Sequence, residues 1–93
     1  MRNNSLFNLN FTVQIFREGK TYVAHNPELN VSSCGSTLDK AKSNLQDALA
    51  GFLKSAQKLG TLDDILEEAG YVRKNKEWTE PQLVLSGRLS LVG

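Results

Sequence analysis

The stretch that decides the fold is residues 21–37, TYVAHNPELNVSSCGST, which contains the chain's only histidine and only cysteine. Residues 21–25 are β-branched and aromatic enough to form a strand. Asn26-Pro27-Glu28 interrupts that strand, because proline lacks an amide donor and biases the residue before it away from helix. Residues 31–34 can form another short strand before a turn at Gly35. The stretch therefore predicts a strand, a turn and a strand leading into a helix.

Upstream of this stretch, residues 7–15 alternate between apolar and polar side chains. The apolar positions are Phe7, Leu9, Phe11, Val13 and Ile15. A period of two is typical of a strand with one buried face. Residues 17–20, Arg-Glu-Gly-Lys, form a polar turn that contains glycine. We therefore expect the two strands on either side of it to pair as an antiparallel hairpin.

Downstream, the spacing of apolar residues predicts a long amphipathic helix. Ser36 or Thr37 is placed to cap its start, and Gly60 is placed to end it. The apolar positions recur at intervals of three and four: Leu38, Ala41, Leu45, Ala48, Leu49, Phe52, Ala56 and Leu59. This pattern gives a helix of about six turns. We expect it to lie on the face of the sheet formed by the odd-numbered residues of the first strand.

Beyond Gly60 the sequence predicts a short second helix, capped by Thr61 and ended by Gly70. A strand or hairpin around Asn75 and a last strand over residues 82–93 follow. The apolar residues of that last strand are Leu83, Leu85, Leu89 and Leu91. The predicted fold class is α+β, in the order β-β-β-α-β: an antiparallel sheet covered on one face by the long amphipathic helix, with a short second helix, in a single domain 1–93.

The composition is that of an ordinary globular chain, 40% hydrophobic and 23% charged. Eleven basic residues against ten acidic ones give a formal net charge of +1, which argues against a broad basic surface for nucleic acid. A single cysteine makes no internal disulfide, which fits a reducing compartment. No segment has the apolar length of a signal peptide or a membrane span. We therefore expect a cytoplasmic protein with no membrane association.

Residues 11–53, FTVQIFREGKTYVAHNPELNVSSCGSTLDKAKSNLQDALAGFL, carry a pattern that resembles the HicB family of antitoxins. The match covers roughly residues 11–56. The residues that match in order and spacing are Tyr22-Val23-Ala24, Pro27-Glu28-Leu29, Ser33, Gly35, Thr37, Ala41 and Leu45. The family commonly has a Gly-Cys pair where this chain has Asn30-Val31. Residues 62–81 also resemble an extension found in one subgroup.

The resemblance implies a partial RNase H-like, HicB-like fold without catalysis. Members of the family bind and block a small toxin, HicA, which cleaves mRNA, so the expected function is a type II antitoxin that occludes a HicA-like mRNA endoribonuclease. Many relatives carry a C-terminal DNA-binding module, and the twelve residues after Pro81 are too few for one. We therefore expect no separate DNA-binding domain and no intrinsic DNA binding. Tyr22, His25 and Glu28, at the end of the second strand and its turn, are expected near the toxin contact.

The residues themselves argue against an enzyme. An RNase H-type nuclease needs a carboxylate near the middle of its first strand for a divalent metal ion, and residues 6–17 contain no acidic residue. His25 and Cys34 come from neighbouring strands and could act as base and nucleophile, but no third residue orients the histidine. We expect Cys34 to be a small buried hydrophobe and His25 a structural or partner-contact residue. No metal and no cofactor are expected.

Two alternatives stay open beside the antitoxin. One is an orphan homo-oligomeric binding protein without a toxin, and the other is an RNA-processing nuclease, which the first strand disfavours. Self-association is expected in either binding role. The leucines at 83, 85, 89 and 91 form an apolar row, and a single small domain has little apolar surface against which to bury it. A terminal strand also exposes unpaired backbone groups. We therefore expect this strand to pair with a second copy, giving a dimer or a tetramer.

Overall fold

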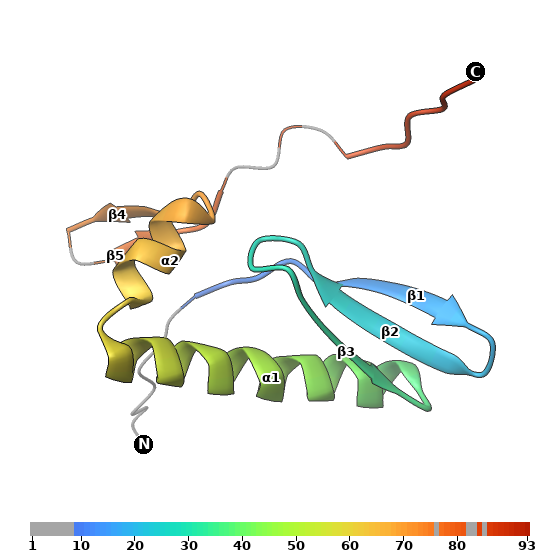
Figure 1. The fold of residues 1–93 in the computed structure, drawn as a ribbon, viewed down its shortest axis with the longest axis horizontal. Coiled ribbons are helices and arrows are strands. Elements are labelled where there is room, and N and C mark those ends of the chain that lie inside the picture. The colour runs from blue at the N-terminus through green and yellow to red at the C-terminus, as the bar shows by residue number, and fades with distance from the viewer. Residues whose placement is uncertain (1–8, 76, 82–83, 85) are drawn as a thin grey trace.

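The computed structural model describes residues 9–75, 77–81, 84 and 86–93 (Figure 1). Within them, the first three elements are β1 (Gln14–Glu18), β2 (Thr21–Asn26) and β3 (Val31–Gly35). The helices α1 (Leu38–Leu59) and α2 (Leu62–Glu68) follow, and then the short strands β4 (Val72–Lys74) and β5 (Glu77–Thr79). The predicted α+β class, with three strands, a long helix and a short second helix in this order, is confirmed.

The strands β1, β2 and β3 form an antiparallel sheet in that spatial order, and α1 lies along one of its faces (Figure 1). The turn between β1 and β2 has only two residues, Gly19 and Lys20, because Glu18 pairs with Thr21. Gly19 has a φ of 63°, and two-residue turns of this kind need a positive φ. Arg17 and Glu18, which the sequence places in the turn, therefore belong to β1.

The first strand lies later in the chain than its alternation predicts. The pattern indicates a strand over residues 7–15, but β1 begins at Gln14, and residues 9–13 precede it without strand pairing. Phe7 lies outside the described residues. The reason is that β2 ends at Asn26, where the chain turns, so no described strand runs beside residues 9–13.

The junctions around β3 explain part of the quoted motif. Asn30 has a φ of 57°, a left-handed conformation that asparagine adopts more readily than most other residues with a side chain. At Gly35 the strand passes so close to α1 that a Cβ would lie 2.6 Å from the amide nitrogen of Ala41. Of the two predicted caps, Thr37 is the N-cap, and its Oγ1 accepts a hydrogen bond from the amide of Lys40 at 3.1 Å.

At its other end, α1 stops at Gly60, as predicted. Gly60 has a φ of 77°, and its amide donates to the carbonyl of Gln57 at 3.2 Å. The next amide, that of Thr61, donates to the carbonyl of Ala56 at 2.9 Å. This pair of bonds satisfies two of the last carbonyls of the helix and is the Schellman arrangement that glycine favours.

The core lies between α1 and the sheet. Four buried residues form its centre: Ala24, Ala41, Leu45 and Leu49. Five partly buried apolar residues pack around them: Phe11, Ile15, Tyr22, Leu29 and Val31. The buried stripe of the helix continues through Leu53, which is 2% exposed and which the predicted set omits. Phe52 and Leu59, predicted on the apolar side, are 39% and 77% exposed, because the stripe advances mostly in steps of four and leaves Phe52 beside it.

Tyr71 attaches the C-terminal part of the chain to the segment that precedes β1. It is 3% exposed, its hydroxyl donates to the carbonyl of Asn10 at 2.5 Å, and its ring centroid lies 5.4 Å from that of Phe11. Burial raises the pKa of Tyr71 above its usual range, and the carboxylates of Glu28 and Glu80 add to the effect. The hydroxyl therefore keeps its proton and remains a hydrogen-bond donor.

The predicted hairpin after α2 is confirmed. β4 and β5 pair as antiparallel strands, and Asn75 in their turn has a φ of 51°. Arg73 lies over the ring of Trp78 at 5.7 Å and pairs with Asp63 at 3.2 Å on an exposed surface. Thr61 is the N-cap residue of α2, as predicted, but its side chain makes no capping hydrogen bond. Its Oγ1 donates instead to the carbonyl of Ala56 in α1 at 3.4 Å.

The tail after Pro81 departs from its prediction. Residues 84 and 86–93 form no strand within the chain, so the last strand is absent from this part of the tail. Leu89 and Leu91 are 92% and 94% exposed. Leu83 and Leu85 lie outside the described residues. Pairing of the tail with a second copy stays a prediction. Separately, no helix in the described ranges is both long and apolar enough to cross a membrane.

Candidate functional site

The sheet has one face covered by α1 and one face that faces away from it (Figure 1). Strand alternation assigns each residue to a face, and the register places cross-strand partners on the same face. We call the uncovered side the open face. It consists of Gln14, Phe16, Glu18, Thr21, Val23, His25, Ser32 and Cys34. The hairpin β4–β5 and helix α2 lie beyond the end of the sheet near the C-terminus of α1, so they leave the open face uncovered (Figure 1).

The apolar part of the open face is a row across the three strands. Phe16 of β1 pairs with Val23 of β2, and Val23 pairs with Cys34 of β3. Phe16 is 50% exposed, Val23 is half-buried and Cys34 is exposed. An aromatic ring, a β-branched side chain and a thiol are therefore held side by side by backbone pairing, on a surface that water reaches.

The neighbouring row of the open face is polar. His25 lies between Gln14 and Ser32 in the register, and its Nδ1 is 2.6 Å from the Oγ of Ser32, within hydrogen-bond distance. Histidine and serine thus face each other across β2 and β3, which fits the structural or contact role expected of His25. This contact involves no carboxylate, so the row lacks the third group that orients a catalytic histidine.

The expectation for Cys34 is wrong. We expect a buried small hydrophobe there, but the thiol is exposed. The reason is strand alternation, because Val31, Ser33 and Gly35 turn toward α1 and leave Ser32 and Cys34 on the open face. His25 and Cys34 do lie on the same face, in adjacent rows.

The three residues expected near a toxin contact do not share one surface. His25 lies on the open face. Tyr22 is on the helix side of β2, where it packs against the core centred on Ala24 and Leu45. Glu28 is in the β2–β3 turn and binds the segment before β1. A role for each of them in partner contact stays a prediction, and the structure gives Tyr22 and Glu28 intramolecular contacts as well.

Glu28, Asn26 and Thr12 form a hydrogen-bonded cluster that we call the turn clip. Both oxygens of the Glu28 carboxylate accept from Thr12, at 2.9 Å from its amide and 2.5 Å from its Oγ1. Asn26, which is fully buried, donates to the carbonyl of Thr12 at 2.8 Å and to Glu28 Oε1 at 2.5 Å, and its Oδ1 accepts from the amide of Leu29 at 2.8 Å. The clip takes the place of strand pairing for residues 9–13, beside which no described strand runs.

The same hydrogen bonds set the charge state of Glu28. Partial burial opposes ionisation of the carboxyl group, but hydrogen bonds from Thr12 and Asn26 outweigh it and lower the pKa of Glu28 below 4.5. The carboxylate is therefore ionised at neutral pH and acts only as an acceptor. Sequence reasoning places Glu28 in a turn but misses this role, because nothing local links it to Thr12, sixteen positions earlier.

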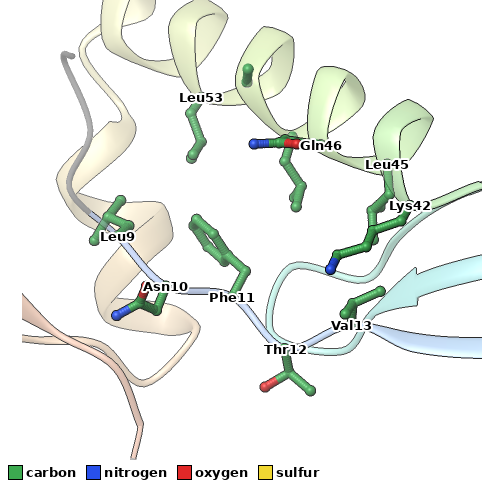
Figure 2. A pocket seen from close by; sticks show the side chains of 11 residues that line it. Leu9, Asn10, Phe11, Thr12, Val13, Lys42, Leu45, Gln46 and Leu53 are labelled. Carbon is green, nitrogen blue, oxygen red and sulfur yellow. The ribbon is translucent and has the colours of Figure 1, made fainter. Parts of the chain in front are cut away.

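A groove of about 440 Å³ lies between the segment before β1 and the flank of α1 (Figure 2). Its lining residues are Leu9, Asn10, Phe11, Thr12, Val13, Lys42, Leu45, Gln46, Leu49, Ala50 and Leu53. Figure 2 shows Phe11 and Leu53 directed into this space and Lys42 at the end near Val13. The groove is mostly apolar, and among the described residues that line it Lys42 is the only charged one. The sequence gives no signal for it, since it forms where residues 9–13 have no described strand beside them.

Metal ligands do not gather in the described ranges of the chain. No group there of three or more histidine, cysteine, aspartate or glutamate side chains could hold a metal ion. The acidic residues of the two helices are all exposed: Asp39, Asp47, Asp63, Asp64, Glu67 and Glu68. Their positions fit solvated surfaces and helix starts, where negative charge is favourable.

Comparisons of the chain with protein-family models, with curated proteins and with solved structures found no match. The resemblance to HicB antitoxins therefore rests on the residues quoted from the sequence and stays a prediction. The geometry contributes two surfaces that a partner could use, the open face and the groove beside α1.

Proposed function

We propose that this chain is a cytoplasmic, non-enzymatic HicB-like antitoxin, which binds a HicA-like mRNA endoribonuclease and blocks its RNA-contacting surface. The observation that carries the proposal is the open face of the sheet, where Phe16, Val23 and Cys34 form an apolar row beside the polar row of His25 and Ser32. A rigid surface with an exposed aromatic side chain and hydrogen-bonding neighbours is the arrangement that protein partners bind.

The physical basis of this binding is burial of apolar area on a preorganised surface. Phe16 is 50% exposed, so a partner that covers it removes a large part of the ring from water. The three strands already fix the backbone on which these side chains stand, so little conformational entropy is lost when the partner binds. Among the strand residues of the open face, Glu18 is the only lysine, arginine, aspartate or glutamate, and it stands beside the turn at the end of β1. Apolar contact and hydrogen bonding therefore give most of the affinity.

The nuclease alternative gains no support from the first strand. The central positions of β1 are Ile15, Phe16 and Arg17, and its one carboxylate, Glu18, stands at the turn. A metal-dependent nuclease of the RNase H type would need a carboxylate at the centre. The orphan binding protein uses the same surfaces without a toxin, and the presence of a small basic reading frame beside the gene distinguishes it from the antitoxin.

The experiment is co-expression of the chain with the product of that neighbouring reading frame. We expect a stable complex and relief of toxicity. The variants Phe16→Arg and Cys34→Arg place a charge on the open face and should weaken toxin binding by about tenfold or more. Phe52→Arg makes the same change on α1, beside its buried stripe and away from the open face, at a residue with 39% exposure, and should bind as the unmodified chain does.

Circular dichroism and urea unfolding establish that each variant is folded. Toxin binding that survives both open-face changes in folded variants would remove the open face as the contact surface. No binding by the unmodified chain, with a neighbouring toxin present and active, would overturn the antitoxin proposal itself.

A further inference from the structure

The outer edge of β1 has no strand beside it in the described residues. The sheet order makes β1 and β3 the two edge strands. On the β3 edge, Nδ2 of Asn44 donates to the carbonyl of Cys34 at 2.8 Å, so α1 satisfies part of that edge. In the β1–β2 hairpin, Glu18 faces Thr21 next to the two-residue turn, so alternation directs the backbone groups of Ile15 and Arg17 outward. An edge of this kind accepts an added strand.

The groove described above continues this edge on the side of α1. Phe11 and Val13 line it from the segment before β1, and Leu49 and Leu53 line it from the helix (Figure 2). Val13 is 37% exposed, so the apolar floor of the groove is open to water. A strand added beside residues 11–17 would direct every second side chain into the groove, because successive side chains point to opposite faces.

The tail has an alternating apolar pattern that suits such an added strand, and its described residues form no strand in their own chain. Residues 86–93, SGRLSLVG, put Leu89 and Leu91 on one side and Arg88 and Ser90 on the other when extended. Leu89 and Leu91 are 92% and 94% exposed, so they lie outside the groove of their own chain. A pair of exposed leucines in the tail, an apolar groove, and an edge with no strand beside it in the described residues indicate two halves of one contact.

We propose that residues 86–93 of a second copy add as a strand to the outer edge of β1, with Leu89 and Leu91 in the groove. The exchange is reciprocal, because each copy offers both an edge and a tail, and a two-fold axis closes it into a dimer. The start of the tail fits this exchange. Nδ2 of Asn10 donates to Oε2 of Glu80 at 3.2 Å, so each tail leaves its own chain beside the groove that the partner's tail enters. The proposal is independent of toxin binding, which uses the open face.

Sedimentation equilibrium of the full chain is the first test. We expect a dimer at micromolar concentration. The double variant Leu89→Ser/Leu91→Ser, and separately Val13→Lys in the groove, should weaken the dimer by about tenfold or more, because each removes apolar burial or adds a charge at the contact. Leu59→Ser changes a leucine that is 77% exposed at the end of α1, and it should leave the dimer unchanged. A monomeric full chain overturns the proposal, as does a dimer that both contact variants leave intact.

Photocrosslinking identifies the occupant of the groove. Gln46, which lines the groove, is replaced by a benzophenone amino acid in an equal mixture of ¹⁴N- and ¹⁵N-labelled chains. The expected products after illumination include crosslinks from position 46 to residues 86–93 that join one ¹⁴N peptide with one ¹⁵N peptide. Crosslinks to the tail within one isotope only would mean that the chain's own tail fills the groove, and this result overturns the proposal. Crosslinks from position 46 to other segments, with none to residues 86–93 of a second copy, overturn it too.

Discussion

Asn26 donates a hydrogen bond to Oε1 of Glu28 at 2.5 Å. This contact joins a fully buried amide to a half-buried carboxylate, and both side chains also form hydrogen bonds with Thr12. Asn26 binds the carbonyl of Thr12 and Glu28 binds its amide, so both backbone groups of one residue are satisfied by side chains of the β2–β3 turn. The segment that lines the groove is therefore held in place by a turn rather than by a strand.

The turn clip makes stability depend on pH through Glu28. We expect Glu28→Gln to lower the free energy of unfolding by about 1–2 kcal/mol at pH 7, since the amide cannot accept both bonds from Thr12. The pKa of Glu28 is lower in the folded chain than its ordinary value of 4.5, so its contribution is fully present well above pH 4.5 and is lost as the pH falls through the folded pKa.

Urea unfolding at pH 7 and at about pH 3 measures this difference. The gap between the unmodified chain and Glu28→Gln should narrow at the lower pH. The control is Glu67→Gln, a change on the exposed side of α2, which should match the unmodified chain at pH 7. A Glu28→Gln variant as stable as the unmodified chain at pH 7 would contradict the role of the clip.

Gly35 and Gly51 should respond to alanine in opposite ways. At Gly35 a Cβ would lie 2.6 Å from the amide nitrogen of Ala41, so Gly35→Ala must push β3 away from α1 and should cost about 1–3 kcal/mol. Gly51 is inside α1 and a Cβ there meets nothing within 4 Å, so Gly51→Ala should stabilise the chain by about 0.5–1 kcal/mol. Thermal unfolding of the two variants compares them directly, and equal shifts of the same sign would show that the close approach at Gly35 is wrong.

The purified chain is expected to cleave neither RNA nor DNA, with or without Mg²⁺ or Mn²⁺. The reason is that β1 carries no carboxylate at its centre, and the His25–Ser32 contact lacks an orienting acid. Incubation with labelled RNA and labelled DNA provides the measurement. Metal-dependent cleavage that co-purifies with the chain and disappears when its acidic residues are substituted would contradict the non-enzymatic function.

Alanine variants of the three residues expected at the toxin contact should separate into two groups. His25→Ala changes the open face and should weaken toxin binding without a large loss of stability. Tyr22→Ala and Glu28→Ala should lower stability, because Tyr22 packs on the core and Glu28 belongs to the turn clip. Calorimetric titration with the toxin, beside urea unfolding of each variant, makes the comparison. If all three variants bind as the unmodified chain does, these residues are not at the contact.

Much of the fold follows from local sequence signals. Gly19, Thr37 and Gly60 mark the turn and the two ends of α1 correctly, because each acts through its own backbone or its nearest neighbours. Local signals cannot place a residue whose environment is set by distant segments. Leu53 is buried because of how α1 meets residues 9–13, and Cys34 is exposed because β3 turns its odd-numbered side chains to the helix. Both require knowledge of the packing, which the spacing alone does not contain.

The sequence predicts less of the candidate site than of the fold. The open face needs the register of three strands, which sets Phe16 beside Val23 and Val23 beside Cys34. The clip joins residues sixteen positions apart, and the groove exists only because β2 ends before it can pair with residues 9–13. The apolar alternation of residues 9–15 predicts a strand, but only its last two residues belong to β1, because no described strand runs beside residues 9–13.

The reactivity of Cys34 tests the proposed contact surface most directly. Its thiol is exposed on the open face, next to Val23 in the register, and the chain has no other cysteine. We measure the rate at which a thiol reagent labels Cys34 in the free chain and in the purified complex with the toxin, using a toxin variant without cysteine. Binding through the open face predicts rapid labelling of the free chain and labelling at least about tenfold slower in the complex, because the partner excludes the reagent. Equal rates in a complex that remains intact throughout the reaction would contradict it.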